Sequence, residues 1–144
     1  MQPKDWALLV IGAAENRGLS PVQLQKVLFL LQRKFPADCL GESFYNFIPY
    51  NYGPFDVQIY YDAEKLEKEG LISITPSAEH RWKTYRVAPA GLRLASELRS
   101  EAPASVLEYL DYVVRWVRGL SFRELVSAIY AEYPEFRVNS VFQE

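Results

Sequence analysis

The sequence is poor in the residues that most enzymes use for catalysis. Its 144 residues include one cysteine, Cys39, and one histidine, His80. A single cysteine forms no intramolecular disulfide, and no export signal is evident, so we expect a cytoplasmic protein in a reducing compartment. The sequence contains no glycine-rich phosphate loop, no paired-cysteine motif and no His-Glu-x-x-His helix. We therefore expect no enzymatic activity, no cofactor and no bound metal.

The one nucleophile–base pair that the sequence leaves open is Cys39 with His80. Cys39 lies between two predicted turns, and no histidine is near it in the sequence. His80 lies beside Arg81 in a predicted hairpin tip, where exposed polar residues are common. A catalytic dyad requires the two side chains to meet in the fold, and the sequence favours a solvated turn histidine instead.

The chain also lacks a charge excess and a long hydrophobic run. Sixteen basic and eighteen acidic residues give a net charge of −2, so a contact with nucleic acid has to be local and is expected to be weak. The longest apolar stretch, Trp6 to Ala14, is far shorter than a membrane span, so we expect no membrane partner. A hydrophobic fraction of 49% excludes intrinsic disorder.

Glycine and proline divide the first third of the chain into two predicted helices. The segment from about Lys4 to Asn16 is apolar on every side, which is typical of a buried helix. Ser20 and Pro21 supply a cap and a first-turn proline for the second helix, which Pro36 ends. Its predicted core face carries Leu24, Val27, Leu28, Leu31 and Phe35, and Phe29 falls on the opposite face.

The middle of the chain predicts an edge strand, a third helix and a hairpin. The strand is expected at Phe44 to Ile48, before Pro49. Tyr52-Gly53-Pro54 predicts a turn into the third helix, which Gly70 ends. The core stripe of this helix is Phe55, Ile59, Ala63 and Leu66. The hairpin strands are expected at Leu71–Thr75 and Trp82–Val87, joined by residues 76–81.

The last third of the chain predicts three further helices. Pro89 and Pro103 begin the fourth and fifth, and a capping box of Ser121 and Glu124 begins the sixth. The order of elements is that of a winged helix-turn-helix. We therefore predict a mainly α (α+β) fold in a single domain covering residues 1–144. Its winged-helix-like core spans about residues 4–88, with a small β-hairpin wing, and a C-terminal helical extension spans about residues 89–144.

Three short motifs resemble the Panacea (SocA-like) antitoxin domain family, and the pattern is also similar to small YwgA-like proteins. The motifs are Leu24-Gln25-Lys26-Val27-Leu28, Tyr52-Gly53-Pro54-Phe55, and the helix exit from Leu66 to Gly70-Leu71-Ile72. The resemblance covers about residues 5–90. The resemblance implies a winged-helix-like module that binds and neutralises a partner toxin. It implies no particular class of toxin, because members of the family differ in partner.

The aromatic residues suggest where such a protein partner would bind. Eight of the 21 aromatic residues lie between Phe44 and Tyr61, and tyrosine is enriched at protein interfaces. On the third helix, Val57 and Tyr61 fall opposite the core stripe, and Glu64 and Lys68 continue that face. We predict that these four residues bind the partner, flanked by Tyr45 and Tyr50. The alternative is that other segments of the chain cover this face.

A DNA-binding transcriptional regulator is the second hypothesis. The reading helix of a winged helix normally enters the major groove, but residues 54–70 hold five acidic and two basic residues, a charge of −3 that repels phosphate. The basic wing residues Arg81, Lys83 and Arg86 are candidate nucleic-acid contacts. The simpler interpretation is a solvated hairpin whose two aromatic residues, Trp82 and Tyr85, pack inward. A self-associating structural protein, for example a homodimer, is the third hypothesis.

Overall fold

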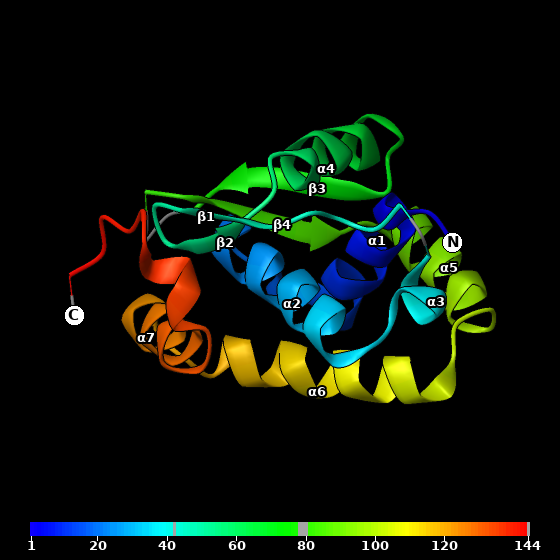
Figure 1. Cartoon of the computed structure of the whole chain (residues 1–144). Helices are drawn as coiled ribbons and strands as arrows, with labels where there is room; N and C mark the ends of the chain where they lie inside the picture. Colours follow the sequence, from blue (N-terminus) through cyan, green and yellow to red (C-terminus); the bar gives the residue numbers. More distant parts are fainter. Residues whose placement is uncertain (42, 78–80, 144) are drawn as a thin grey trace.

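The computed structural model describes residues 1–41, 43–77 and 81–143 (Figure 1). Helices hold 60% of the residues, as expected for a mainly α (α+β) chain. The helices of the described part are α1 (Pro3–Ala13), η1 (Glu15–Arg17), α2 (Pro21–Lys34), α3 (Ala37–Leu40), α4 (Gln58–Lys68), α5 (Pro89–Arg99), α6 (Ala104–Arg118), α7 (Phe122–Glu132) and η2 (Pro134–Arg137). The strands form two antiparallel hairpins, β1 (Ile48–Tyr50) with β2 (Gly53–Phe55) and β3 (Ile72–Pro76) with β4 (Lys83–Val87).

Helices α1 and α2 form the centre of the molecule. The β3–β4 hairpin and α4 cover one side of this pair, α6 covers the other, and α5 and α7 close the two ends (Figure 1). Trp6 to Ile11 in α1 are all buried, as the all-round apolar pattern predicted. None of the helices in the described part of the chain is long and apolar enough to cross a membrane.

Helix α2 is more deeply buried than its hydrophobic stripe suggested. Phe29, which the sequence placed opposite the core face, has no exposed surface. The edges of three rings surround it, at centroid distances of 4.9 to 5.4 Å, from Phe47, Tyr133 and Phe136. Both faces of α2 are therefore core, because η2 and the segment before β1 cover the second face.

The predicted helix starts are confirmed where a capping box is present. Gln23 N donates to Ser20 Oγ at 3.2 Å, and Ser20 N donates to the Gln23 side chain at 2.9 Å. Ser121 and Glu124 form the same pair of bonds at the start of α7, at 2.8 and 3.1 Å. These local bonds satisfy amide groups that have no partner within the helix, so the start is encoded within four residues.

Two boundaries near the centre of the chain differ from the prediction. The strand expected at residues 44–48 lies instead at Ile48–Tyr50. Pro54 does not begin a helix: it lies in β2, paired with Pro49, and α4 begins at Gln58. Phe55 consequently leaves the predicted core stripe and stacks on Tyr50 at 4.6 Å. The rest of the stripe, Ile59, Ala63 and Leu66, is buried as predicted.

The loop between α1 and α2 is fixed to the second hairpin. Helix α1 ends at Ala13 rather than at residue 16, and η1 follows it. Leu19 and Tyr85 then exchange two backbone hydrogen bonds of 2.9 and 2.8 Å. Gly18 allows this approach: its φ is +76°, and a Cβ there would lie 2.6 Å from Tyr85 O. The strands β3 and β4 themselves lie within one or two residues of the predicted ranges.

Candidate functional site

Two of the motifs that carry the family resemblance meet inside the molecule. Gln25 Nε2 donates to Asp56 O at 3.0 Å, and Asp56 N donates to Gln25 Oε1 at 3.0 Å. Lys26 Nζ donates to Pro54 O at 3.0 Å. The Gln-Lys pair of α2 therefore holds the backbone of β2 and the start of α4. We call these three bonds the α2 clasp.

Lys26 is an unusual member of this clasp because its ammonium group is buried. Its side chain is 2% exposed, and burial lowers its pKa to about 7. Gly53, with φ +105°, lies between Lys26 and the ring of Tyr130: a Cβ there would be 3.6 Å from Lys26 Cε and 3.4 Å from Tyr130 Cε1. The Tyr130 hydroxyl is buried and has no hydrogen-bond partner among the described residues.

Tyr45, predicted to bind a partner, is a core residue. It is 3% exposed, and its hydroxyl donates to Asp62 Oδ2 at 2.5 Å. Burial and the Asp62 carboxylate raise the pKa of Tyr45 well above its usual value. Gln58 Nε2 donates to the second Asp62 oxygen at 3.0 Å. The prediction for Tyr45 was wrong because the acceptor that satisfies its hydroxyl lies 17 residues away.

The other residues predicted to bind a partner lie on the surface of α4 and β1. Val57, Tyr61, Glu64 and Lys68 are all exposed, with exposed fractions of 47% for Val57 and 56% for Tyr61. Tyr50 and its neighbour Ile48 in β1 are about half exposed. Tyr50 stacks on Phe55, whose ring meets Tyr60 of α4 at 5.3 Å. The structure therefore joins Tyr50 to α4 through an aromatic row. We call Ile48, Tyr50, Val57 and Tyr61 the α4 surface.

The wing residues Arg81, Lys83 and Arg86 are also exposed. Arg86 has an internal role: its Nε donates to Asn16 O at 3.3 Å, and its NH1 donates to Thr75 Oγ1 at 3.2 Å. Tyr85 packs inward as expected, whereas Trp82 remains 37% exposed. His80 and the centre of the predicted hairpin tip lie outside the described residues. A dyad of His80 with Cys39, which is half-buried in α3, therefore stays an untested alternative.

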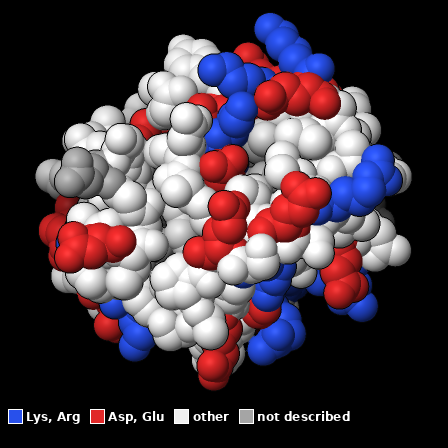
Figure 2. Space-filling model, turned by 90° about the vertical axis from the view of Figure 1, so that its right-hand side faces the viewer, with Lys and Arg blue, Asp and Glu red and all other residues white. Residues whose placement is uncertain are grey.

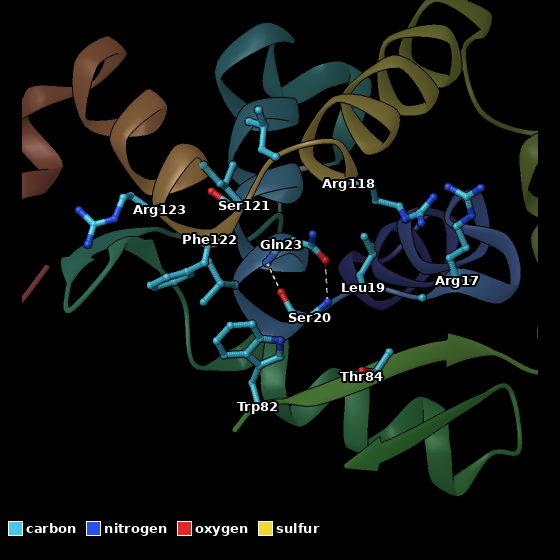
Figure 3. Close-up of a pocket in the computed structure, with 14 residues that line it drawn as sticks. Arg17, Leu19, Ser20, Gln23, Trp82, Thr84, Arg118, Ser121, Phe122 and Arg123 are labelled. Carbon is cyan, nitrogen blue, oxygen red and sulfur yellow. Dashed lines mark hydrogen bonds between the residues drawn. The ribbon is translucent and has the colours of Figure 1, made fainter. Parts of the chain in front are cut away.

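Sequence reasoning missed a cleft of about 780 Å³ beside Trp82 (Figure 3). It lies where η1, the end of α6 and the starts of α2 and α7 approach the β3–β4 hairpin. Its lining includes three arginines, Arg17, Arg118 and Arg123, and none of the described residues that line it is acidic. We call it the arginine cleft. Arg17 lies about 100 residues from the other two in the chain, so no local pattern could have shown that it meets them.

The aromatic wall of the arginine cleft is formed by Trp82 and Phe122. Their ring centroids are 5.7 Å apart with a tilt of 36°. Tyr52 supports Phe122 from behind with an edge contact at 5.1 Å. In Figure 3 the two rings stand on one side of the cleft, and Arg17 and Arg118 lie together on another. A planar group and an anion could therefore bind side by side.

Charge in the arginine cleft differs from charge on the opposite end of the molecule. Figure 2 shows that the end with the N-terminus carries acidic and basic side chains mixed together. In the cleft, Arg17 and Arg118 form no ion pair within the described part of the chain. Burial and the neighbouring Arg17 lower the pKa of Arg118, and Glu15 acts in the opposite direction.

In comparisons with known proteins, neither a family model nor a curated protein matches this sequence. Among the described residues, no group of three or more histidine, cysteine or acidic side chains is placed to hold a metal ion.

Proposed function

We propose that this chain is a cytoplasmic, protein-binding module of the antitoxin type, which grips its partner through the α4 surface. The observation that carries the proposal is the exposure of Val57 and Tyr61, one helical turn apart on the charged outer face of α4. Two exposed apolar side chains in this position, with exposed Tyr50 joined to α4 through Phe55 and Tyr60, have the composition of an interface centre.

The attachment of the α4 surface to the core supports the same proposal. The α2 clasp fixes the backbone at Pro54 and Asp56, immediately before Val57. The buried bond from Tyr45 to Asp62 fixes α4 one residue after Tyr61. A surface held in this way loses little conformational entropy when it binds a partner, and such preorganisation raises affinity.

A winged-helix-like arrangement of residues 4–88 is part of the proposal. It is supported by the order of α1, α2, α4, β3 and β4, and by the isolated antiparallel bridge between Leu19 and Tyr85, which ties the loop before α2 to the hairpin. In this arrangement α4 takes the place of the reading helix. Its exposed face offers Tyr61 and Glu64 where arginine or asparagine would be needed to read bases. Protein binding is therefore favoured over sequence-specific DNA binding.

The proposal can be tested with the adjacent reading frame of the genome as the candidate toxin. We expect expression of that frame alone to stop growth, and co-expression of this chain to restore it through a stable complex. Tyr61→Ala and Val57→Asp should abolish both the rescue and the complex, while circular dichroism shows a native fold.

A photo-crosslinking residue would show which surface touches the partner. Placed at position 61 it should capture the partner. Placed at Tyr112, an equally exposed tyrosine on α6, it should not. Capture from position 112 alone, or a complex that survives both the Tyr61 and Val57 substitutions, would show that the partner binds elsewhere.

A further inference from the structure

The arginine cleft has the features of a small-ligand site and shares no residue with the α4 surface. Its volume of about 780 Å³ lies within the range of pockets that hold small molecules, about 300–1,000 Å³. Residues from six segments line it: η1, the loop after η1, the start of α2, the end of α6 with the loop after it, the start of α7, and the β3–β4 hairpin. A site assembled from so many segments is fixed by the tertiary fold rather than by one flexible loop.

Arg17 and Arg118 lie together on one side of the cleft (Figure 3). Two guanidinium groups side by side repel each other, and the burial of Arg118 adds a desolvation cost. An anion between them would remove both costs. A phosphate group suits the position because guanidinium groups bind its oxygens with paired, charge-assisted hydrogen bonds.

The starts of two helices add to the positive potential of the cleft. Ser20 caps α2 and Ser121 caps α7, and both serines line the cleft. The N-terminal end of a helix carries a partial positive charge and favours anions. Two carboxylates lie nearby. Glu124 accepts a hydrogen bond from Ser121 N, and the negative charge of Glu15 raises the pKa of Arg118. Arg123 lies at the far end, where its NH1 donates to Gln143 O at 3.2 Å.

Trp82 and Phe122 supply aromatic rings, which a site for phosphate alone does not need. Trp82 keeps 37% of its surface exposed, beside an arginine-lined cleft rather than in the core. Any of the nucleobases can stack on such rings, because each base has a flat aromatic face. Thr84 and Ser20, which also line the cleft, offer hydroxyl groups of the kind that bind a sugar.

We propose that the arginine cleft binds a nucleotide unit, with its base against Trp82 and Phe122 and its phosphate between Arg17 and Arg118. The unit has two sources: a free nucleotide, or one residue of a single-stranded nucleic acid. Duplex DNA does not fit the proposal, because its bases are already stacked and offer no free face.

The test measures the binding of AMP and of a short, fluorescently labelled oligoadenylate by the full chain at low salt, about 50 mM. We expect at least one of them to bind. Arg118→Ala and Trp82→Ala should each weaken that binding about tenfold or more, since one phosphate contact or one stacked base is lost. The conservative variants Arg118→Lys and Trp82→Phe should retain most of it, which separates lost contacts from lost folding.

Matched controls lie on other surfaces. Arg93→Ala on α5 removes an exposed arginine, and Tyr112→Ala on α6 removes an exposed aromatic ring. Neither should change the affinity by more than about twofold. Competition between the two ligands then identifies the source of the unit: AMP displaces the oligonucleotide at similar concentration if one free nucleotide fills the site.

Four results would overturn the proposal. Neither ligand binds, or both bind equally well to the Arg118 and Trp82 alanine variants. Inorganic phosphate binds as tightly as AMP, which would show that the rings contribute nothing. A blunt DNA duplex binds more tightly than the single strand and loses affinity with Lys83→Ala, which would place the contact on the wing. None of these outcomes bears on the α4 surface, so the two proposals can fail independently.

Discussion

Gln25 occupies both backbone polar groups of Asp56, donating to its carbonyl and accepting from its amide at 3.0 Å each. One side-chain amide thereby replaces the two neighbours that a strand or helix would have supplied at this point. The contact joins residues 31 positions apart in the chain. It explains why a glutamine lies buried in the middle of α2, a position where the helical pattern alone would favour an apolar side chain.

Replacing this glutamine should destabilise the protein, because it removes the hydrogen-bond partner of two backbone groups at a buried position. Gln25→Ala leaves the amide and carbonyl of Asp56 unpaired in a half-buried position. We expect a loss of about 2–4 kcal/mol, from two groups at about 1–3 kcal/mol each with partial access to water. Urea denaturation measures this loss. Gln143→Ala, at an exposed position, should stay within about 0.5 kcal/mol of the parent.

The stability of the protein should rise with pH above neutrality because of Lys26. Burial lowers the pKa of Lys26 from 10.5 to about 7. Between these values the unfolded chain holds a proton that the native protein has released, so raising the pH favours the native state. The slope should approach about 1.4 kcal/mol per pH unit from one such group. Denaturation at a series of pH values between 7 and 10 measures it.

The variant Lys26→Met should flatten this pH dependence, since it removes the titrating group. Tyrosines do not interfere in the same window. The pKa values of Tyr45 and Tyr85 are raised by burial, so these residues favour the native state below about pH 10 and lose that contribution only at higher pH. A slope that persists unchanged in the methionine variant would assign the effect to another group.

Two buried tyrosine hydroxyls should respond in opposite ways to removal. The Tyr130 hydroxyl has no partner among the described residues, so Tyr130→Phe removes an unsatisfied group and should stabilise the fold by about 1 kcal/mol. The Tyr45 hydroxyl donates to the buried Asp62 carboxylate, so Tyr45→Phe should cost about 1.5–3 kcal/mol. Thermal unfolding distinguishes the two signs. Destabilisation by both substitutions would mean that Tyr130 has a partner in solution, such as a bound water.

The contrast between predicted and missed features follows the range of the interactions. The starts of α2 and α7 were predictable because Ser20 and Ser121 form their bonds within the next three residues. The hairpin of β1 and β2 was missed because Gln25 and Lys26 hold it across about 30 residues. A proline such as Pro54 is locally compatible with a helix start. The α2 clasp holds it in β2 instead.

The candidate sites also differ in whether local or long-range interactions form them. The outward position of Val57 and Tyr61 followed from helical spacing once Ile59 was assigned to the core. Asp62 lies on the same helix and is buried, where it accepts a hydrogen bond from Tyr45, a contact that helical spacing does not show. The arginine cleft was not foreseen, since Arg17 and Arg118 meet only after α6 has packed along α2.

Substitutions on the two faces of α4 should have different effects, on stability at the inner face and on partner binding at the outer face. Ile59 has no exposed surface, so Ile59→Ala leaves a cavity and should cost about 2–5 kcal/mol. Tyr61 and Val57 are about half exposed, and Tyr61→Ala and Val57→Asp should change the stability by about 0.5 kcal/mol or less. Urea denaturation of the three variants measures this difference. If the Tyr61 and Val57 variants unfold as readily as the Ile59 variant, the outer face of α4 is part of the core and the partner surface lies elsewhere. If all three differ as expected, a loss of partner binding in the two surface variants reports the interface itself, because the fold that presents it is intact.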